Sequence, residues 1–374
     1  MKYELHPSFI NLLIVILIVS ACNTQNKKEP PPEKPTDEIV FIEPFPDLIP
    51  GEVNLDESCF GEIKELAGKQ ITTNEIMKIK ETEILVCDSM LIMKNLSSGN
   101  MLKAFSLPDF KLIKSFGKAG RGPGELQSPK LVKAEEDECL CYIYQQANNN
   151  LYKLDFNLEL LEVDFELPKS TTKRAFNDKQ LYSLSASNFV YVESIPRGKG
   201  LFSYKIEDDS VYHKMVHNLS FSDSHKSWAS YIGDFAANQK KGRMVFAYKY
   251  FKRLTFTDLE GKNLRTLIFD SNEAKRGDAV SVMGPENITH YWGISAQKEH
   301  VYLLYSGRSP IDVNREWAKK SYYIFVEQYD WNGNPVKKYK LDNWGYFTVD
   351  EERGKIYMAS VNDAEPFFVF DLVE

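Results

Sequence analysis

One pair of histidines has the spacing of metal ligands. His213 and His217 stand four residues apart, which would place both imidazoles on one face of a helix. The flanking residues are valine, tyrosine and methionine, which indicate a strand, and in a strand this spacing separates the side chains by about 13 Å. The glutamate of an HExxH zinc site is also absent. We therefore expect surface histidines and assign no metal site.

The sequence has no recognisable nucleophile or phosphate-binding motif. No GxSxG segment places a serine on a strand-to-helix turn. Gly117, Gly120, Gly122 and Gly124 form a glycine-rich stretch, but neither GxGxxG nor Walker spacing is present and no helical pattern follows. The acidic residues 135–138 cluster in a predicted turn, where carboxylates are normally solvated. We therefore assign no catalytic residue.

Aromatic and basic residues in predicted loops are better candidates for a ligand site. Trp228, His290 and Trp292 lie in aromatic-rich segments, and aromatic rings stack on the CH faces of sugars. We add two cationic residues to these candidates: Arg121, at the tip of the glycine-rich stretch, and Arg308, beside a predicted insertion. We expect these five residues to contact a ligand. The alternative is that the aromatic side chains fill gaps between structural units.

The first residues of the chain predict a targeting signal. Phe9–Val19 is apolar except for Asn11 and is shorter than the roughly 20 residues that a membrane-spanning helix needs. Residues 19–22 (VSAC) resemble a bacterial lipobox, in which Cys22 is lipidated and becomes the first mature residue. An ordinary signal peptide with an incidental cysteine is the alternative. We assign residues 1–21 to a signal peptide.

The segment after Cys22 predicts a tether. Asn23–Asp37 contains four prolines and many charges but no large apolar residue, so it cannot bury enough surface to fold, and its prolines favour an extended chain. Several acyl chains on Cys22 would anchor the protein stably in a membrane. We therefore expect residues 22–50 to link a lipid anchor in the cell envelope, at the outer membrane, to a folded body.

Composition limits the nature of that body. The 374 residues are 43% hydrophobic, which excludes a disordered chain, and contain 20 Gly and 17 Pro, far fewer than a collagen-like fibre needs. There are 46 Lys and Arg against 53 Asp and Glu, for a net charge of −7. An acidic surface repels phosphate, so we expect no nucleic-acid partner.

Short apolar and aromatic runs separated by turn clusters predict an all-β fold. The strands expected from these runs are Glu83–Cys87, Cys139–Tyr144, Phe189–Glu193, Met244–Tyr248, Val301–Tyr305, Tyr323–Val326 and Lys355–Met358. Helical candidates are few: Glu57–Leu66, and Arg315–Lys320 inside a loop. The four cysteines after Cys22 are as compatible with buried thiols as with disulfides.

A strand, a turn built on aspartate and an alternating strand recur six times. The aspartates are Asp109, Asp155, Asp208, Asp258, Asp330 and Asp371, at intervals of 46, 53, 50, 72 and 41 residues. A period of about 40–50 residues with four strands per unit is typical of propeller blades. The long interval contains two expected insertions, Ser271–Glu286 and Arg308–Lys320. The last unit lacks an outer strand, which we expect from Val53–Phe60 or Ile71–Ile79.

Phe116–Leu126, followed by Pro129, resembles the loop between blades of NHL-type six-bladed propellers. With the lipobox and the length, the chain is similar to the TolB-like six-bladed propeller lipoproteins of Gram-negative gut bacteria. The resemblance implies an all-β fold, a six-bladed β-propeller over residues 51–374, after the lipoprotein signal and tether. It also implies a ligand site at the central funnel or its loops.

The expected function is that of a binding or scaffolding module for a glycan, peptide or protein partner, without a cofactor. Propellers of similar architecture include hydrolases such as lactonases, and lyases, which hold a divalent cation such as Ca²⁺ in the central tunnel. A propeller hydrolase or lyase of this kind is therefore the alternative. The fold by itself does not decide between them.

Overall fold

The computed structural model describes residues 51–372 except residues 74, 76, 78, 80, 96–98, 135–138, 171–177, 209 and 270–283. The predicted signal peptide, lipidation site and tether lie outside the described residues, as do the acidic cluster at 135–138 and most of the insertion predicted at Ser271–Glu286. No helix of the described part has the length and apolar content needed to cross a bilayer.

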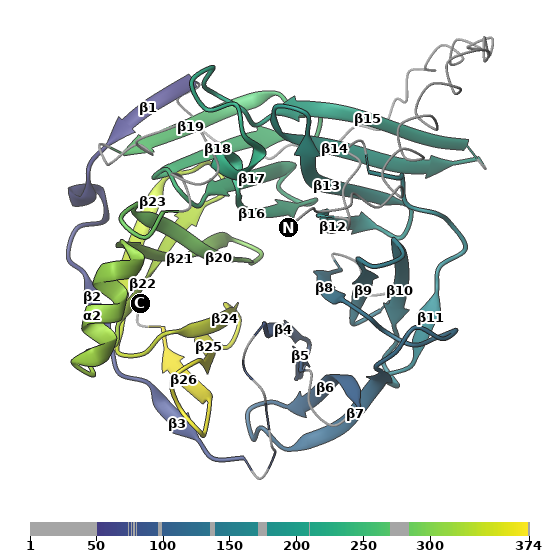
Figure 1. The fold of residues 1–374 in the computed structure, drawn as a ribbon, viewed down its shortest axis with the longest axis horizontal. Coiled ribbons are helices and arrows are strands. Elements are labelled where there is room, and N and C mark those ends of the chain that lie inside the picture. The colour runs from purple at the N-terminus through teal and green to yellow at the C-terminus, as the bar shows by residue number, and fades with distance from the viewer. Residues whose placement is uncertain are drawn as a thin grey trace, which may run out of the picture. The chain divides into compact units, whose positions relative to one another are not determined.

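Six antiparallel sheets surround a common centre, with one strand of each sheet innermost (Figure 1). Neighbouring innermost strands contact each other all the way round, so the sheets form a closed ring. The innermost strands are β4 (Glu83–Cys87), β8 (Pro129–Lys133), β12 (Gln180–Ser185), β16 (Gly233–Asn238), β20 (Thr289–Ala296) and β24 (Gly345–Asp350). We number the sheets as blades one to six in this order. The predicted all-β, six-bladed propeller is confirmed.

The second strands of the second to sixth blades each match a predicted apolar run, whereas the run predicted at Glu83–Cys87 is the innermost strand β4 and no run was predicted at the second strand of the first blade. The second strands are β5 (Met90–Lys94), β9 (Cys141–Gln145), β13 (Asn188–Ile195), β17 (Arg243–Tyr248), β21 (His300–Arg308) and β25 (Lys355–Ser360). The third strands are β6 (Asn100–Ser106), β10 (Asn150–Leu154), β14 (Gly198–Glu207), β18 (Arg253–Asp258), β22 (Ile324–Asp330) and β26 (Phe367–Asp371). The outer strands of the first five blades are β7 (Leu112–Lys118), β11 (Leu160–Glu162), β15 (Ser210–Asn218), β19 (Asn263–Phe269) and β23 (Pro335–Leu341).

The six recurring aspartates all stand at or just after the end of the third strand of a blade, and in the first five blades they mark the hairpin that leads to the outer strand. Two examples show why aspartate suits this place. The Asp258 carboxylate accepts the backbone N–H of Lys262 at 2.8 Å, and that of Asp330 accepts those of Asn332 at 2.9 Å and Asn334 at 2.8 Å. The side chain thus satisfies turn amides that no strand pairs. The aspartate repeat predicted from the sequence therefore coincides with the repeat of the blades.

The hydrophobic core is divided into layers between neighbouring blades. Between the sixth and first blades, for example, the ring of Phe367 packs on those of Phe105 and Phe110, with centroids 5.2 and 4.9 Å apart. The middle strands are therefore covered on both faces, and every residue of β9 and β17 is buried. This explains why such strands are continuous apolar runs and not alternating ones.

The N-terminal segment closes the ring. β3 (Lys69–Ile71) pairs antiparallel with β26, Ile71 opposite Phe367, and is the outer strand of the sixth blade. An N-terminal strand was expected there, but it lies between the two stretches proposed for it and shares only Ile71 with the second. We call residues 51–71 the N-terminal belt, because they run from the fourth to the sixth blade.

Two further strands of the belt cover sheet edges. β1 (Gly51–Leu55) pairs parallel with β19, and β2 (Lys64–Leu66) pairs parallel with β23, so the fourth and fifth blades have five strands. Such added strands protect edges that would otherwise pair with other chains. The predicted helix Glu57–Leu66 is wrong. Only the 3₁₀ turn η2 (Glu57–Phe60) is helical, because the edge of β23 offers the following residues backbone partners.

A buried ion cluster fastens the belt to the fourth and fifth blades. Glu327 is fully buried, and its carboxylate lies 3.1 Å from the Lys252 ammonium and 2.9 Å from that of Lys338. Glu57 of η2 pairs with both lysines from the outer side. Two buried tyrosines, Tyr291 and Tyr329, donate hydroxyl hydrogen bonds to Glu327. Two buried cations are thereby neutralised by one buried and one half-exposed carboxylate.

Candidate functional site

The five predicted ligand residues lie at one face of the propeller. In every blade the innermost strand begins, and the second strand ends, at this same face, which we call the loop face. Arg121 lies in the connection from β7 to β8, and Trp228 opens the 3₁₀ turn η3 (Trp228–Tyr231) before β16. His290 and Trp292 belong to the first half of β20, and Arg308 is the last residue of β21.

The structure does not bring all five residues together. His290 is on a strand and not in a loop; only 1% of it is exposed, and its ring stacks on Tyr305. Its expected exposure is therefore wrong, because the neighbouring blades cover both faces of β20 at this point. Arg121 is exposed between the first and second blades, whereas Trp292 and Arg308 belong to the fifth.

The glycine-rich connection is a self-contained turn. Gly117 and Gly124 have φ of +69° and +72°, but Gly120 does not. At Gly120 a Cβ would lie 1.8 Å from the Glu125 carboxylate, so any larger residue would displace that side chain from the turn. That carboxylate accepts the N–H of Gly122 at 2.9 Å. The loop supplies its own anion, which explains why it is a turn between blades and not a phosphate cradle.

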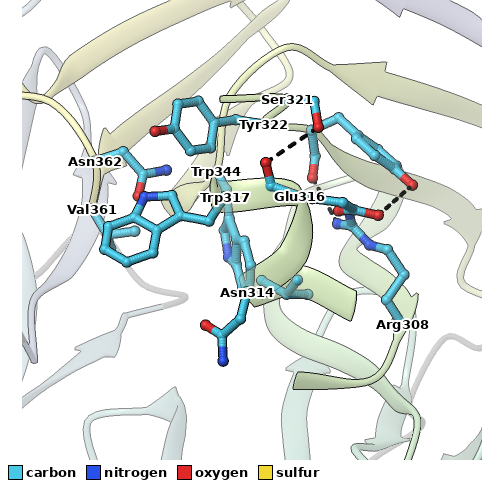
Figure 2. A pocket seen from close by; sticks show the side chains of 11 residues that line it. Arg308, Asn314, Glu316, Trp317, Ser321, Tyr322, Trp344, Val361 and Asn362 are labelled. Atoms are coloured by element: carbon cyan, nitrogen blue, oxygen red, sulfur yellow. Dashed lines mark hydrogen bonds and ion pairs between the residues drawn. The ribbon is translucent and has the colours of Figure 1, made fainter. Parts of the chain in front are cut away.

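A cavity of about 180 Å³ lies on the loop face of the fifth and sixth blades (Figure 2). The residues around it come from the insertion after β21 and from two connections of the sixth blade. They are Arg308, Val313, Asn314, Glu316, Trp317, Ser321, Tyr322, Tyr323, Trp344, Val361 and Asn362. Of the five predicted residues, Arg308 alone lines this cavity.

The insertion forms the helix α2 (Pro310–Ala318). Ser309 caps its first turn by accepting the N–H of Asp312 at 3.2 Å, and Pro310 occupies the position where a missing N–H costs nothing. The helix begins earlier than the Arg315–Lys320 candidate, but the insertion was expected. α2 presents Trp317, which is 57% exposed, on the side of the cavity where Val361 and Asn362 stand (Figure 2).

Arg308 holds α2 in place. Its guanidinium pairs with Glu316, donates to the carbonyl of Tyr323 at 2.7 Å and lies 3.9 Å over the Tyr323 ring. The Tyr323 hydroxyl donates to the other oxygen of Glu316 at 3.3 Å. The Arg308 side chain is 10% exposed. We conclude that Arg308 shapes the wall of the cavity and is mostly engaged within it.

An aromatic path leads from the cavity toward the fourth blade. Trp344, in the connection before β24, lines the cavity and packs edge-to-face on Trp292, with ring centroids 5.8 Å apart. Lys249 places its ammonium 3.9 Å from the centre of the Trp292 ring. Trp292 was predicted from the sequence, whereas Trp317, Trp344 and Lys249 were not. Trp317 could have been recognised, because it is a tryptophan inside an expected insertion. Trp344 and Lys249 could not, because only the folded chain brings them next to Trp292.

Charged groups also gather where the innermost strands begin. Glu83 binds the ammonium groups of Lys94 at 3.0 Å and Lys130 at 2.5 Å; although burial opposes it, these lysines hold the pKa of Glu83 below its usual value. Burial raises the pKa of Asp234 on β16. No group of three or more His, Cys, Asp or Glu side chains among the described residues forms a cluster suited to a metal ion.

A second cavity, of about 280 Å³, lies over the outer strands of the second blade and is lined by residues 149–151 and 162–166. Glu162, Asp164 and Glu166 make its wall acidic. It has one aromatic side chain, Phe165, against four in the cavity beside α2. The cavity beside α2 is therefore the better candidate for a ligand with apolar faces.

The sequence profile of the family described as TolB-like 6-blade propeller-like matches residues 60–352. The chain belongs to this family. A comparison with curated proteins found no match to this TolB-like propeller.

Solved structures support the same fold. A member of the DUF4221 family from Bacteroides vulgatus is 14% identical with a TM-score of 0.57, over 84% of this chain and 97% of that one. An exported protein from Bacteroides fragilis is 11% identical with a TM-score of 0.53, over 86% and 99%. Regucalcin of Agrobacterium tumefaciens, described as calcium-binding, is 12% identical over 83% and 95%, at a TM-score of 0.47 that carries no functional argument.

Proposed function

We propose that this TolB-like propeller is a lipid-anchored binding module of the cell envelope that holds a glycan in the cavity beside α2. The observation that carries the proposal is the lining of that cavity, in which four aromatic side chains, one of them the exposed Trp317, stand among hydrogen-bonding side chains. Sugars offer both an apolar CH face and hydroxyl groups, and this combination matches rings beside amides and hydroxyls.

The dimensions of the cavity fit part of a chain-like ligand. Its 180 Å³ is below the roughly 300–1,000 Å³ of sites that enclose a drug-sized molecule. Trp317 and Trp344 stand on its walls, with Asn314 and Asn362 as the amide donors and acceptors nearby. One sugar ring bound here would leave its neighbours outside, along the aromatic path to Trp292.

Replacing Trp317 by alanine tests the site. We expect the affinity for the bound glycan to fall by about thirtyfold, equal to roughly 2 kcal/mol for a tryptophan at the centre of an interface. Because Trp317 is more than half exposed, the free energy of unfolding should change by less than about 0.5 kcal/mol. A glycan array followed by titration calorimetry, on the full chain in detergent micelles, measures the loss.

Trp228→Ala is the matched control, since Trp228 is also a partly exposed tryptophan of the loop face but does not line the cavity. Its affinity should stay within twofold of the wild-type value. Equal losses in the two variants would contradict the site. Binding of a protein or peptide in place of any glycan would assign the scaffolding role, and cation-dependent turnover would assign the propeller hydrolase or lyase.

Replacing Cys22 by alanine tests the anchor. We propose that acyl chains on Cys22 hold the protein at the outer membrane, because residues 19–22 resemble a lipobox and are followed by a proline-rich tether. The variant should move from the membrane fraction to the soluble fraction. Cys59→Ala, a cysteine of the N-terminal belt, should remain with the membrane. Membrane retention of the Cys22→Ala protein would overturn the proposal.

A further inference from the structure

We propose that the glycan is acidic and that the Lys249 ammonium binds a carboxylate of the sugar lying against Trp292. This inference rests on the proposed function and adds a second subsite, for a hexuronate residue, beside the cavity. It is carried by the position of one cation on the aromatic path.

The fold fixes the position of Lys249. The residue follows β17 at the loop face, and its N–H donates to the carbonyl of Ile232 at 2.8 Å. Its own carbonyl accepts the N–H of His290 at 2.7 Å. The backbone is thus held between the fourth and fifth blades, and the ammonium is directed over Trp292. A cation whose position is already fixed loses little conformational entropy when a ligand binds.

Lys249 differs in its partners from several other lysines at the loop face that are not exposed. Lys94 and Lys130 both pair with Glu83, and Lys199 pairs with Asp178. Within the described part of the chain, no carboxylate lies within ion-pair distance of the Lys249 ammonium, which lies 3.9 Å from the centre of the Trp292 ring and 6.0 Å from that of Tyr250. Burial lowers the pKa of Lys249, against the opposing effect of Asp234. A partly desolvated cation without a paired anion is well suited to a carboxylate from outside.

Trp292 connects this cation to the cavity. The pairing of β20 with β21 shifts register on both sides of Tyr291, and such bulges redirect side chains near functional sites. Here the shift leaves Trp292 40% exposed on a strand whose neighbours are mostly covered. Trp292 touches Trp344 of the cavity wall and carries Lys249 on its face. A glycan bound in the cavity therefore continues toward a positive charge.

Paired oligosaccharides test the inference. The full chain in detergent micelles is titrated with neutral hexose oligomers and with the corresponding hexuronates (glucose and glucuronate, galactose and galacturonate, mannose and mannuronate), at low ionic strength. We expect the hexuronate of at least one pair to bind about tenfold more tightly than its neutral partner. Lys249→Gln should abolish this preference.

Lys298→Gln is the matched control. It removes the same charge from an exposed lysine in the hairpin between β20 and β21, at the opposite face of the same blade, and should preserve the preference. Equal binding of neutral and acidic oligomers, or equal effects of the two variants, would overturn the inference while leaving the glycan site intact. Tighter binding of a sulfated hexose than of any hexuronate would contradict the proposal that the subsite binds a carboxylate. Binding of no oligomer at all would overturn the proposed function as well.

Discussion

Replacing Glu327 by alanine is expected to lower the free energy of unfolding by about 3–5 kcal/mol, the cost of leaving buried charges without their partner. The carboxylate is fully buried between the ammonium groups of Lys252 and Lys338, whose side chains are 1% and 5% exposed. After the substitution only half-exposed Glu57 would face both cations. Two tyrosine hydroxyls would also lose their acceptor. Urea unfolding followed by tryptophan fluorescence measures the loss.

The control is another ion pair of the belt. Glu65 on β2 lies 2.8 Å from the Lys340 ammonium, but the two side chains are 75% and 38% exposed. Glu65→Ala should change the free energy of unfolding by less than about 1 kcal/mol, because water already solvates both charges. Similar effects of Glu327→Ala and Glu65→Ala on the free energy of unfolding would show that burial of the ion cluster does not stabilise the fold.

Ending the chain at Pro366 is expected to abolish cooperative folding. The deletion removes β26 and with it Phe367 and Phe370, both fully buried. Each would cost about 3–5 kcal/mol if truncated to alanine alone, and a domain has only about 5–15 kcal/mol in total. β3 also loses its partner, so the ring opens. Thermal unfolding followed by circular dichroism should show no cooperative transition.

A chain that ends at Leu372 is the control, because it keeps β26 and removes only two residues beyond it. Its melting temperature should match that of the full chain. A sharp transition at the normal temperature in the protein that ends at Pro366 would mean that the closure of the ring by β3 and β26 does not stabilise the fold.

The sequence allowed the fold to be predicted in some detail because each blade repeats the same local chemistry. Middle strands such as β17 are covered on both faces and stand out as apolar runs, and an aspartate such as Asp330 stands at or just after the end of each third strand. The belt was harder to predict. β2 and β3 are three residues each and take their structure from edges offered by strands about 275 and 300 residues later.

The candidate site was less predictable than the fold. Its aromatic residues are individually unremarkable in sequence and meet only because α2, the end of β23 and the start of β24 converge at the loop face. His290, in contrast, was wrongly predicted to be an exposed loop residue. It stands two residues before Trp292, where regular strand alternation would place both side chains on one face. The register of β20 shifts on both sides of Tyr291, and His290 is buried against Tyr305 while Trp292 stays exposed.

The N-terminal belt has a consequence for biosynthesis. Its strands are the first of the propeller to leave the ribosome, yet Ile71 must wait for Phe367, nearly 300 residues later, before it can pair. At about 5–20 residues per second that delay is roughly 15–60 s. Through this interval β3 remains without its partner, and a nascent chain that stalls or is cleaved before its last strand never acquires a closed ring. Maturation of this protein is therefore a late, post-synthetic event governed by the arrival of its C-terminus.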